Sequence, residues 1–151
     1  MKLTDIFQKT CVCVPLQSTG KRAAITELVD LLNEKGQITD RDEVLKAVLD
    51  REETRSTGIG LGLAVPHGKS HGCRRLTMAV GKPATPMDFD AVDGRPCDLI
   101  VLLASPVDKT GPHIQALAGI SRLWQNGNFR RDVLEAKSAD ELYAAIERNQ
   151  A

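Results

Sequence analysis

The sequence predicts a single α/β domain over residues 1–151, with a mixed or mostly parallel β-sheet and flanking helices. Short apolar runs, which are typical of strands, alternate along the chain with longer segments of helical periodicity. One such run, residues 99–103, is apolar throughout, as expected of a strand that is buried on both faces. The length fits one domain, and no repeat, low-complexity tract or linker divides the chain.

The first part of the chain predicts one strand and two helices. Residues 11–16 form a short apolar run that predicts the strand. Residues 21–35 place apolar side chains at helical spacing, and Gly36 is a natural stop signal. The second helix is expected to start at Thr39, three residues before an acidic side chain as in a capping box, and to end near residues 51–53.

A glycine-rich segment follows at residues 58–65. Its larger apolar side chains alternate with glycine or alanine, which predicts a strand with one nearly bare face. Such a face lets another backbone or a ligand come close. Pro66 then restricts the backbone, so His67 is expected at the end of this strand.

The alternation continues in the second half. Residues 76–80 and 99–103 are expected as strands, with a turn at residues 93–94 between them. The Gly-Pro pair at residues 111–112 then opens a helix. The apolar side chains expected to face the core from this helix are Ile114, Leu117 and Ala118, with Leu123 further along.

Two final helices are expected, with Asn128 and Ser138 as their N-caps. Ser138 and Glu141 together form a capping-box pattern. Leu142 and Ile146 supply the apolar face of the last helix.

Composition and charge argue against several classes of protein. Twenty basic and twenty acidic residues cancel, whereas a nucleic-acid-binding domain usually has a basic excess, so no nucleic-acid partner is expected. The longest strongly apolar stretch, residues 99–104, is too short to cross a bilayer, and the N-terminus has no signal-peptide pattern. A cytoplasmic protein is therefore expected. The four cysteines lack CxxC and zinc-ligand spacing, which predicts buried free thiols.

The glycines near His67 raise the question of nucleotide binding, and two motif tests argue against it. A Walker A loop that ends in Gly68-Lys69-Ser70 requires glycine at position 63, where the chain has leucine. The dinucleotide fingerprint also fails, because its third glycine position holds Val65.

The histidines at positions 67, 71 and 113 are the remaining candidates for chemistry. A metal site at His67 and His71 is disfavoured, because neighbouring glycines work against a helix there and the zincin glutamate is missing. A lone histidine is more often structural than catalytic. However, a glycine-lined strand that ends in Pro-His presents the imidazole at the edge of a sheet, where α/β folds commonly bind ligands. His113 is expected in the first turn of a helix, whose free N–H groups favour an anion.

Other residues near these histidines suit a phosphoryl group. Arg51 offers a planar charged fork for phosphate oxygens, and Ser56 and Thr57 offer hydroxyl donors. Taken singly, Arg51 and Ser56 are more often solvated surface residues. Backbone N–H groups around His67, including that of Gly68, complete the expected phosphate site, which requires no metal or cofactor.

Together these residues resemble the fructose/mannitol-type enzyme IIA family of the phosphoenolpyruvate-dependent sugar phosphotransferase system, over nearly the whole chain. The strongest part of the resemblance is residues 51–68, which read REETRSTGIGLGLAVPHG. A turn and strand at residues 89–106 and a segment at residues 113–118 follow in the order typical of the family.

The resemblance implies a single domain with a mixed sheet between helices, in which His67 is phosphorylated and His113 is the second active-site histidine. It implies an HPr-like phosphocarrier as donor. The acceptor is a cysteine of a IIB domain in the transport branch, whereas in the nitrogen-regulatory branch the phosphorylation state controls a target protein. Residues 56–60 favour the regulatory branch, and sugar transport is the alternative.

Two functions of other classes remain as rival hypotheses. One is a binding module that senses a small anion at the same pocket without covalent chemistry. The other is a metal-dependent hydrolase that uses His67, His71 and His113.

Overall fold

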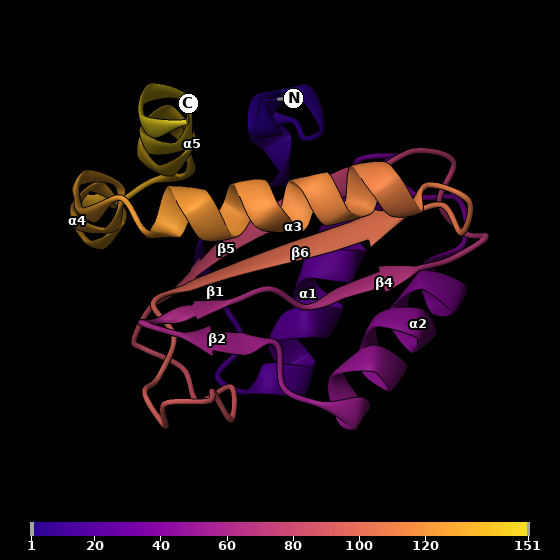
Figure 1. Ribbon diagram of the computed structural model, residues 1–151, viewed down its shortest axis with the longest axis horizontal. Helices are drawn as coiled ribbons and strands as arrows, with labels where there is room; N and C mark the ends of the chain where they lie inside the picture. Colours follow the sequence, from indigo (N-terminus) through magenta and orange to yellow (C-terminus); the bar gives the residue numbers. More distant parts are fainter. Residues whose placement is uncertain (1, 151) are drawn as a thin grey trace.

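The computed structural model describes residues 2–150 and contains a six-stranded mixed sheet with helices on both faces (Figure 1). The strands are β1 (Val12–Leu16), β2 (Gly58–Gly60), β3 (Leu63–Ala64), β4 (His67–Lys69), β5 (Thr77–Pro83) and β6 (Leu99–Ser105). The helices are α1 (Lys21–Glu34), α2 (Arg41–Thr54), α3 (Thr110–Trp124), α4 (Gly127–Glu135) and α5 (Ala139–Asn149). Two short 3₁₀ helices, η1 (Leu3–Asp5) and η2 (Lys9–Cys11), precede β1. The predicted fold class is confirmed.

The strands follow the spatial order β1-β5-β6-β3-β2, and β4 also pairs with β6. β3 and β4 lie end to end along the same edge of β6, both parallel to it, with Leu63 opposite Leu99 and His67 opposite Leu103. β5 runs antiparallel to β6 on its other edge. The sheet is therefore mixed, and the parallel pairs place the ends of β4 and β6 side by side.

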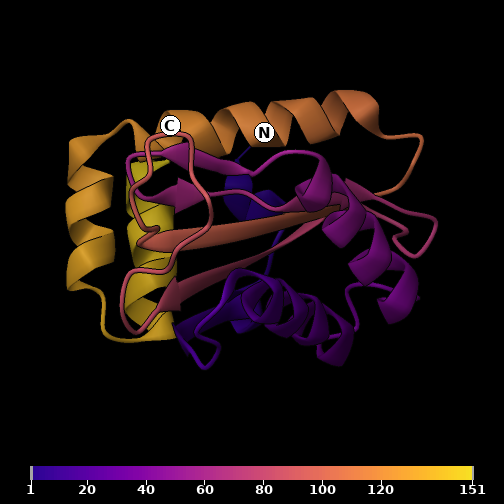
Figure 2. The same ribbon diagram turned by 90° about the horizontal axis from the view of Figure 1, so that it is seen from below.

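Helices lie on both sides of the sheet, with α3 over one face and α1 over the other (Figure 2), and an apolar cluster packs against each face. Alternate residues of β6 serve both clusters: Leu99, Val101 and Leu103 pack with α3, α4 and α5, whereas Ile100, Leu102 and Ala104 pack with α1 and α2. Every residue of β6 is buried, which confirms the expectation for this strand. The alternation follows from the two-residue period of a strand.

The glycine-rich segment differs from the single strand that its pattern predicts. β2 and β3 form a tight antiparallel hairpin, because Gly60, Leu61 and Gly62 all take positive φ angles of 99°, 57° and 92°. Glycine adopts this backbone region without steric cost, whereas leucine rarely does. Ile59 and Leu61 are consequently exposed, and Leu63 is buried. His67 is correspondingly the first residue of β4 and not the end of one long strand.

Two predicted helix starts are displaced by one or two residues. Asp40, not Thr39, caps α2, because its carboxylate accepts a hydrogen bond from the N–H of Glu43. Thr39 instead uses both its N–H and its hydroxyl to bind the carbonyl of Gly72. Asn126, not Asn128, caps α4. The N-cap predicted at Ser138 is confirmed.

Helix α3 begins where expected but buries a different face. Its buried residues are His113, Ala116, Ile120, Leu123 and Trp124. Ile114 has 60% of its surface exposed and Ala118 is also exposed, so the predicted apolar stripe was wrong for these two residues. With this face of α3 buried, His113 points toward the sheet, where its polar ring needs a hydrogen-bond partner.

The cysteines and the lengths of the helices test two further predictions from the sequence. Cys11, Cys73 and Cys97 are buried free thiols as predicted, whereas Cys13 is only half-buried. Within residues 2–150, no helix is both long and apolar enough to cross a membrane.

Candidate active site

His67 lies between α2 and the edge of β6. Pro66 precedes it, and the carbonyl of Pro66 accepts a hydrogen bond from the N–H of Leu103. The next residue, Gly68, packs so closely on α2 that a Cβ atom there would lie 3.0 Å from the backbone nitrogen of Val48. Strand pairing on one side and helix contact on the other therefore fix the position of His67.

A backbone carbonyl determines which nitrogen of His67 carries the proton. The Nδ1 atom lies 2.7 Å from the carbonyl oxygen of Val65. A carbonyl oxygen can only accept a hydrogen bond, so Nδ1 is the protonated nitrogen in the neutral ring. The lone pair of the neutral imidazole is consequently on Nε2, which is the nitrogen that can act as a nucleophile.

His113 lies beside this ring, in the first turn of α3. The two ring centroids are 5.4 Å apart, and the ring planes are inclined by 59°. His113 is only 4% exposed, and its Nδ1 atom lies 2.6 Å from the Oγ atom of Ser105 at the end of β6. Two histidines separated by 46 positions in the sequence thus share one site.

Burial holds both imidazoles neutral. It lowers the pKa of His67, the hydrogen bond to Val65 opposes this shift, and of the nearby charges Arg51 and Lys69 lower the pKa whereas Glu52 raises it. Burial also lowers the pKa of His113 to about 4, with smaller contributions from His67 and Lys69. At neutral pH both rings are therefore uncharged and have a free lone pair.

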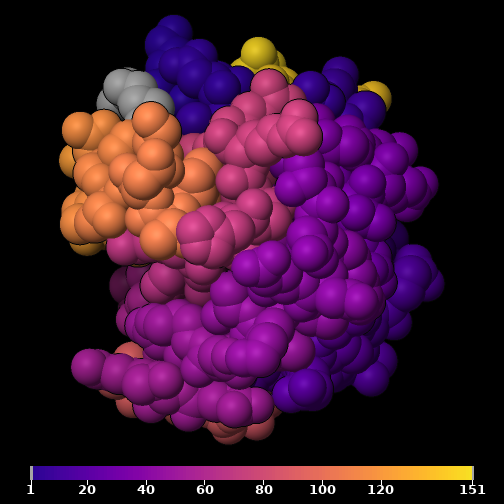
Figure 3. Space-filling model, turned by 90° about the vertical axis from the view of Figure 1, so that its right-hand side faces the viewer, coloured from indigo at the N-terminus to yellow at the C-terminus, as the bar shows by residue number. Residues whose placement is uncertain are grey.

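The start of α3 adds backbone donors to the same region. The first hydrogen bond of the helix runs from the N–H of His113 to the carbonyl of Lys109, so the N–H groups of Thr110 and Gly111 precede it. Such groups, together with the helix dipole, favour an anion. The beginning of α3 (orange) and the α2 region (purple) both reach the surface on this side of the molecule (Figure 3).

Arg51 lies in the last turn of α2 and is half-buried. Its Nη1 atom donates a hydrogen bond of 2.9 Å to the carbonyl of Arg55, which directs the guanidinium back along the helix end. Burial is the main cause of the lowered pKa of His67, and the charge of Arg51 adds a smaller contribution in the same direction. The guanidinium thus already has a backbone partner, and its direct contact with a phosphoryl group stays a prediction.

The hydroxyl groups of Ser56 and Thr57 already bind within the protein. Ser56 Oγ donates to the carbonyl of Phe89 and accepts from the N–H of Gly58 at 3.0 Å. Thr57 is buried, and Glu52 accepts hydrogen bonds from both its hydroxyl and its N–H. These two residues shape the loop before β2, and their direct contact with phosphate stays a prediction.

Sequence reasoning missed two side chains of the site. Lys69 stands two residues after His67 on the same face of β4, and its Nζ atom lies 3.1 Å from Thr110 Oγ1 at the start of α3. The two-residue period of a strand could have identified it. Ser105, which holds His113, is the polar end of an otherwise apolar strand, and this position was the available signal.

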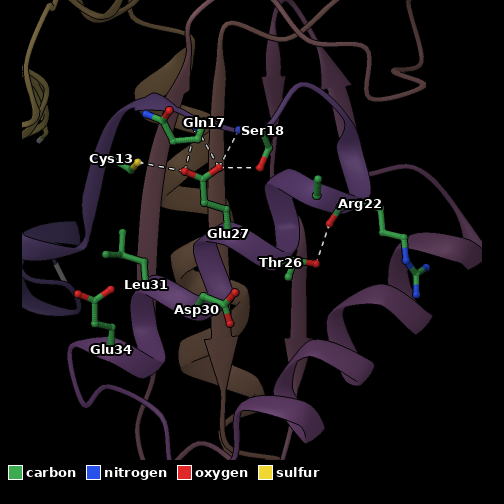
Figure 4. A pocket seen from close by; sticks show the side chains of 10 residues that line it. Cys13, Gln17, Ser18, Arg22, Thr26, Glu27, Asp30, Leu31 and Glu34 are labelled. Carbon is green, nitrogen blue, oxygen red and sulfur yellow. Dashed lines mark hydrogen bonds between the residues drawn. The ribbon is translucent and has the colours of Figure 1, made fainter.

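A wide surface groove lies away from these histidines, between α1 and β1 (Figure 4). It has a volume of about 980 Å³. Glu27 in its wall accepts hydrogen bonds from Gln17, Ser18 and Cys13, so its carboxylate is occupied in holding the turn before α1. This groove therefore offers wide space but no free reactive group comparable with His67.

The described residues gather no metal-binding cluster. Among residues 2–150, no group of three or more His, Cys, Asp or Glu side chains is placed to hold a metal ion. His71, the third member of the suggested hydrolase set, is exposed in a turn after β4.

Comparison with known proteins identifies the family. The sequence profile of the family described as "Phosphoenolpyruvate-dependent sugar phosphotransferase system, EIIA 2" matches residues 5–149. The chain belongs to this family. The EIIA 2 assignment confirms the resemblance inferred from the sequence, and the match covers every strand and every α-helix described above.

Proteins of two kinds are similar to this chain, namely fructose-specific phosphotransferase components and nitrogen regulatory proteins. A fructose-specific EIIA component of Haloferax volcanii is 36% identical over 141 residues, which cover 91% of this chain and 92% of that protein. A fructose-specific EIIABC component of Bacillus subtilis is 32% identical over 97% of this chain, which spans only 23% of that longer protein. The crystal structure of the nitrogen regulatory protein IIA-Ntr of Neisseria meningitidis superimposes with a TM-score of 0.85 at 29% identity, over 94% of this chain and 97% of that one.

Proposed function

We propose that this chain is a phosphoryl carrier in which Nε2 of His67 accepts a phosphoryl group from a phosphohistidine of an HPr-like donor. The observation that carries the proposal is the hydrogen bond from His67 Nδ1–H to the carbonyl of Val65, at 2.7 Å. It leaves Nε2 as the nucleophile in a ring that burial keeps neutral. Membership of the EIIA 2 family supports this chemistry.

The bonds that form and break in the transfer involve only the two imidazoles and the phosphoryl group. The Nε2 lone pair of His67 attacks phosphorus while the bond from phosphorus to the donor nitrogen breaks, and its electron pair returns to the donor ring. His67 keeps its proton on Nδ1, where the Val65 carbonyl stabilises the positive charge that develops. A donor ring that is protonated on its other nitrogen leaves as neutral imidazole.

Positioning and charge stabilisation are the main requirements of phosphoryl transfer. Lys69, Arg51 and the start of α3 supply positive charge around the phosphoryl oxygens. His113 supplies a directed donor: if the Ser105 hydroxyl donates to Nδ1, the proton of the neutral His113 ring is on Nε2. Because its pKa is low, His113 is neutral at neutral pH and donates this hydrogen bond as an uncharged ring.

The acceptor of the phosphoryl group depends on the branch of the family. The IIA-Ntr structure of Neisseria meningitidis and the motif at residues 56–60 favour a regulatory role, in which phosphorylation of His67 controls a target protein in the cytoplasm. The fructose-specific relative of Haloferax volcanii favours the second candidate, in which a IIB domain takes the phosphoryl group. Reconstitution with a purified IIB domain separates the two, because only a transport protein passes phosphate to it rapidly.

Covalent uptake tests the central function. The protein is incubated with phosphoenolpyruvate, enzyme I and an HPr-like carrier, and its intact mass is measured. We expect the addition of one phosphoryl group only when the carrier is present. A protein that binds free phosphate but gains no covalent group would instead be an anion sensor.

A further inference from the structure

A buried carboxylate lies near the site and has no role in the transfer described above. Glu52 is 5% exposed, and it is the one buried Asp, Glu, Lys or Arg residue within residues 2–150. Lys21 of α1 places its Nζ atom 3.0 Å from Oε2 of Glu52. A carboxylate in such a position is costly to bury unless its oxygens are paired and hydrogen-bonded.

Both oxygens of Glu52 are used to hold Thr57. Oε2 accepts a hydrogen bond of 2.8 Å from the Thr57 N–H, and Oε1 accepts one of 2.5 Å from the Thr57 hydroxyl. Charge-assisted hydrogen bonds of this kind are stronger than neutral ones. Glu52 therefore fixes the backbone of Thr57, which lies five residues later in the chain.

Thr57 is joined in turn to the partner of His67. The carbonyl of Thr57 accepts a hydrogen bond of 3.0 Å from the N–H of Val65. The carbonyl of the same residue, Val65, accepts the Nδ1–H of His67 at 2.7 Å. Four residues thus form one continuous path from the buried carboxylate to the reactive ring.

The ion pair connects this path to α1 and to the segment before β6. Lys21 also lies 3.5 Å from Asp90 and 5.7 Å from the centre of the Phe89 ring. The carbonyl of Phe89 is the acceptor for Ser56, the residue before Thr57. The loop at residues 56–57 is consequently held from α1, from α2 and from the segment before β6.

We propose that Glu52, supported by Lys21, is a positioning residue that holds the Val65 carbonyl against His67 and so keeps Nε2 free of a proton. This inference rests on the proposed function, since a fixed tautomer matters only if Nε2 is the nucleophile. Without the carboxylate, Thr57 and Val65 lose their anchor, and the His67 proton can occupy Nε2. A ring with its proton on Nε2 has no lone pair there for attack.

Glu53 provides a matched control for this role. It is the next residue of α2 and also forms an ion pair, with Arg22 at 3.6 Å, but both side chains are mostly exposed. Glu52→Gln and Glu53→Gln make the same change of charge one residue apart. Exposed pairs contribute little, so the second substitution should alter neither folding nor transfer.

The experiment combines NMR of the imidazole nitrogens with single-turnover phosphorylation. In wild type and Glu53→Gln, the His67 nitrogens should report Nδ1–H and unprotonated Nε2. In Glu52→Gln, a population with the proton on Nε2 should appear, and phosphoryl uptake should slow by about tenfold or more. The NMR arm is recorded on unphosphorylated protein, so it decides the inference even if no phosphoryl transfer occurs and the proposed function fails.

A second variant guards against misfolding. Thr57→Val removes only the hydroxyl donor to Glu52 and keeps the N–H donor and the side-chain volume, so it should show a smaller change of the same kind. The result that would overturn the inference is a His67 tautomer in folded Glu52→Gln, or in folded Thr57→Val if Glu52→Gln does not fold, that equals the tautomer in Glu53→Gln, whatever the transfer rate.

Discussion

His67 and His113 meet at a ring separation of 5.4 Å, yet each is fixed through its Nδ1 atom by a different partner. The carbonyl of Val65 holds His67, and the hydroxyl of Ser105 holds His113. A carbonyl can only accept a hydrogen bond, whereas a hydroxyl can also donate one. The proton of the neutral ring is therefore on Nδ1 in His67 but can be on Nε2 in His113. One Nε2 then offers a lone pair and the other offers a proton.

His113→Ala should slow phosphoryl uptake without abolishing it. The substitution removes a hydrogen-bond donor to the phosphoryl oxygens but leaves the His67 nucleophile in place, which predicts a loss of about tenfold to a hundredfold in rate. Single-turnover measurement of phosphate gain and loss checks this. Unchanged rates would remove His113 from the site, and complete loss of uptake in a folded variant would make it essential.

Arg51 should contribute through its charge and its planar shape. Arg51→Ala is expected to slow transfer from the carrier by about tenfold to a hundredfold, and Arg51→Lys should recover only part of the loss, because an ammonium lacks the bidentate fork. Arg55→Ala is the control, since Arg55 is exposed and only its backbone carbonyl contacts Arg51. Equal rates in all of these proteins would show that Arg51 takes no part in the transfer.

Burial of neutral His113 should make the protein sensitive to acid. Its pKa is about 4 in the folded state, below the ordinary value of 6.5, so the unfolded chain binds more protons between these values. The free energy of unfolding therefore falls as the pH is lowered, by about 2 kcal/mol between pH 7 and pH 5 from this residue. Urea unfolding at both pH values should show a smaller fall in His113→Asn. An identical fall in both proteins would contradict the assignment.

Gly68 should be needed for close packing of β4 on α2. A Cβ atom at this position would lie 3.0 Å from the Val48 nitrogen and 3.1 Å from the Ala47 carbonyl carbon, both backbone atoms. Gly68→Ala should therefore destabilise the fold by about 1–3 kcal/mol and displace His67, as urea unfolding and phosphorylation rates can show. Gly119→Ala meets only Leu3 at 3.6 Å and should be neutral or stabilising. Equal stabilities for the two variants would refute the packing argument.

The sequence predicted those parts of the fold that depend on local pattern. The uninterrupted apolar run of β6 and the capping serine of α5 are examples. The prediction failed where a contact distant in the sequence determines the helix start. Thr39 binds the carbonyl of Gly72, and Asp40 caps α2 instead. The hairpin at Leu61 was missed because its positive φ contradicts the strand-like alternation around it.

The candidate site was predictable to a similar extent. His67 and His113 could be selected by residue type and position, and the structure places their rings 5.4 Å apart, whereas the third histidine, His71, is exposed in a turn after β4. The partners of His67 and His113 could not be selected in this way, because Val65 acts through a backbone carbonyl that every residue has. Ser105 acts on His113 from the end of a different element, so the pairing requires the folded topology.

The most direct test is the chemical position of the phosphoryl group. After incubation with phosphoenolpyruvate, enzyme I and an HPr-like carrier, NMR that correlates phosphorus with the imidazole nitrogens should show one phosphoryl group, bound to Nε2 of His67. The signal should be absent in His67→Ala and retained in His71→Ala, which changes an exposed histidine four residues later. Phosphate on Nδ1, on His113 or on any other residue, or full phosphorylation of His67→Ala, would contradict the proposed mechanism.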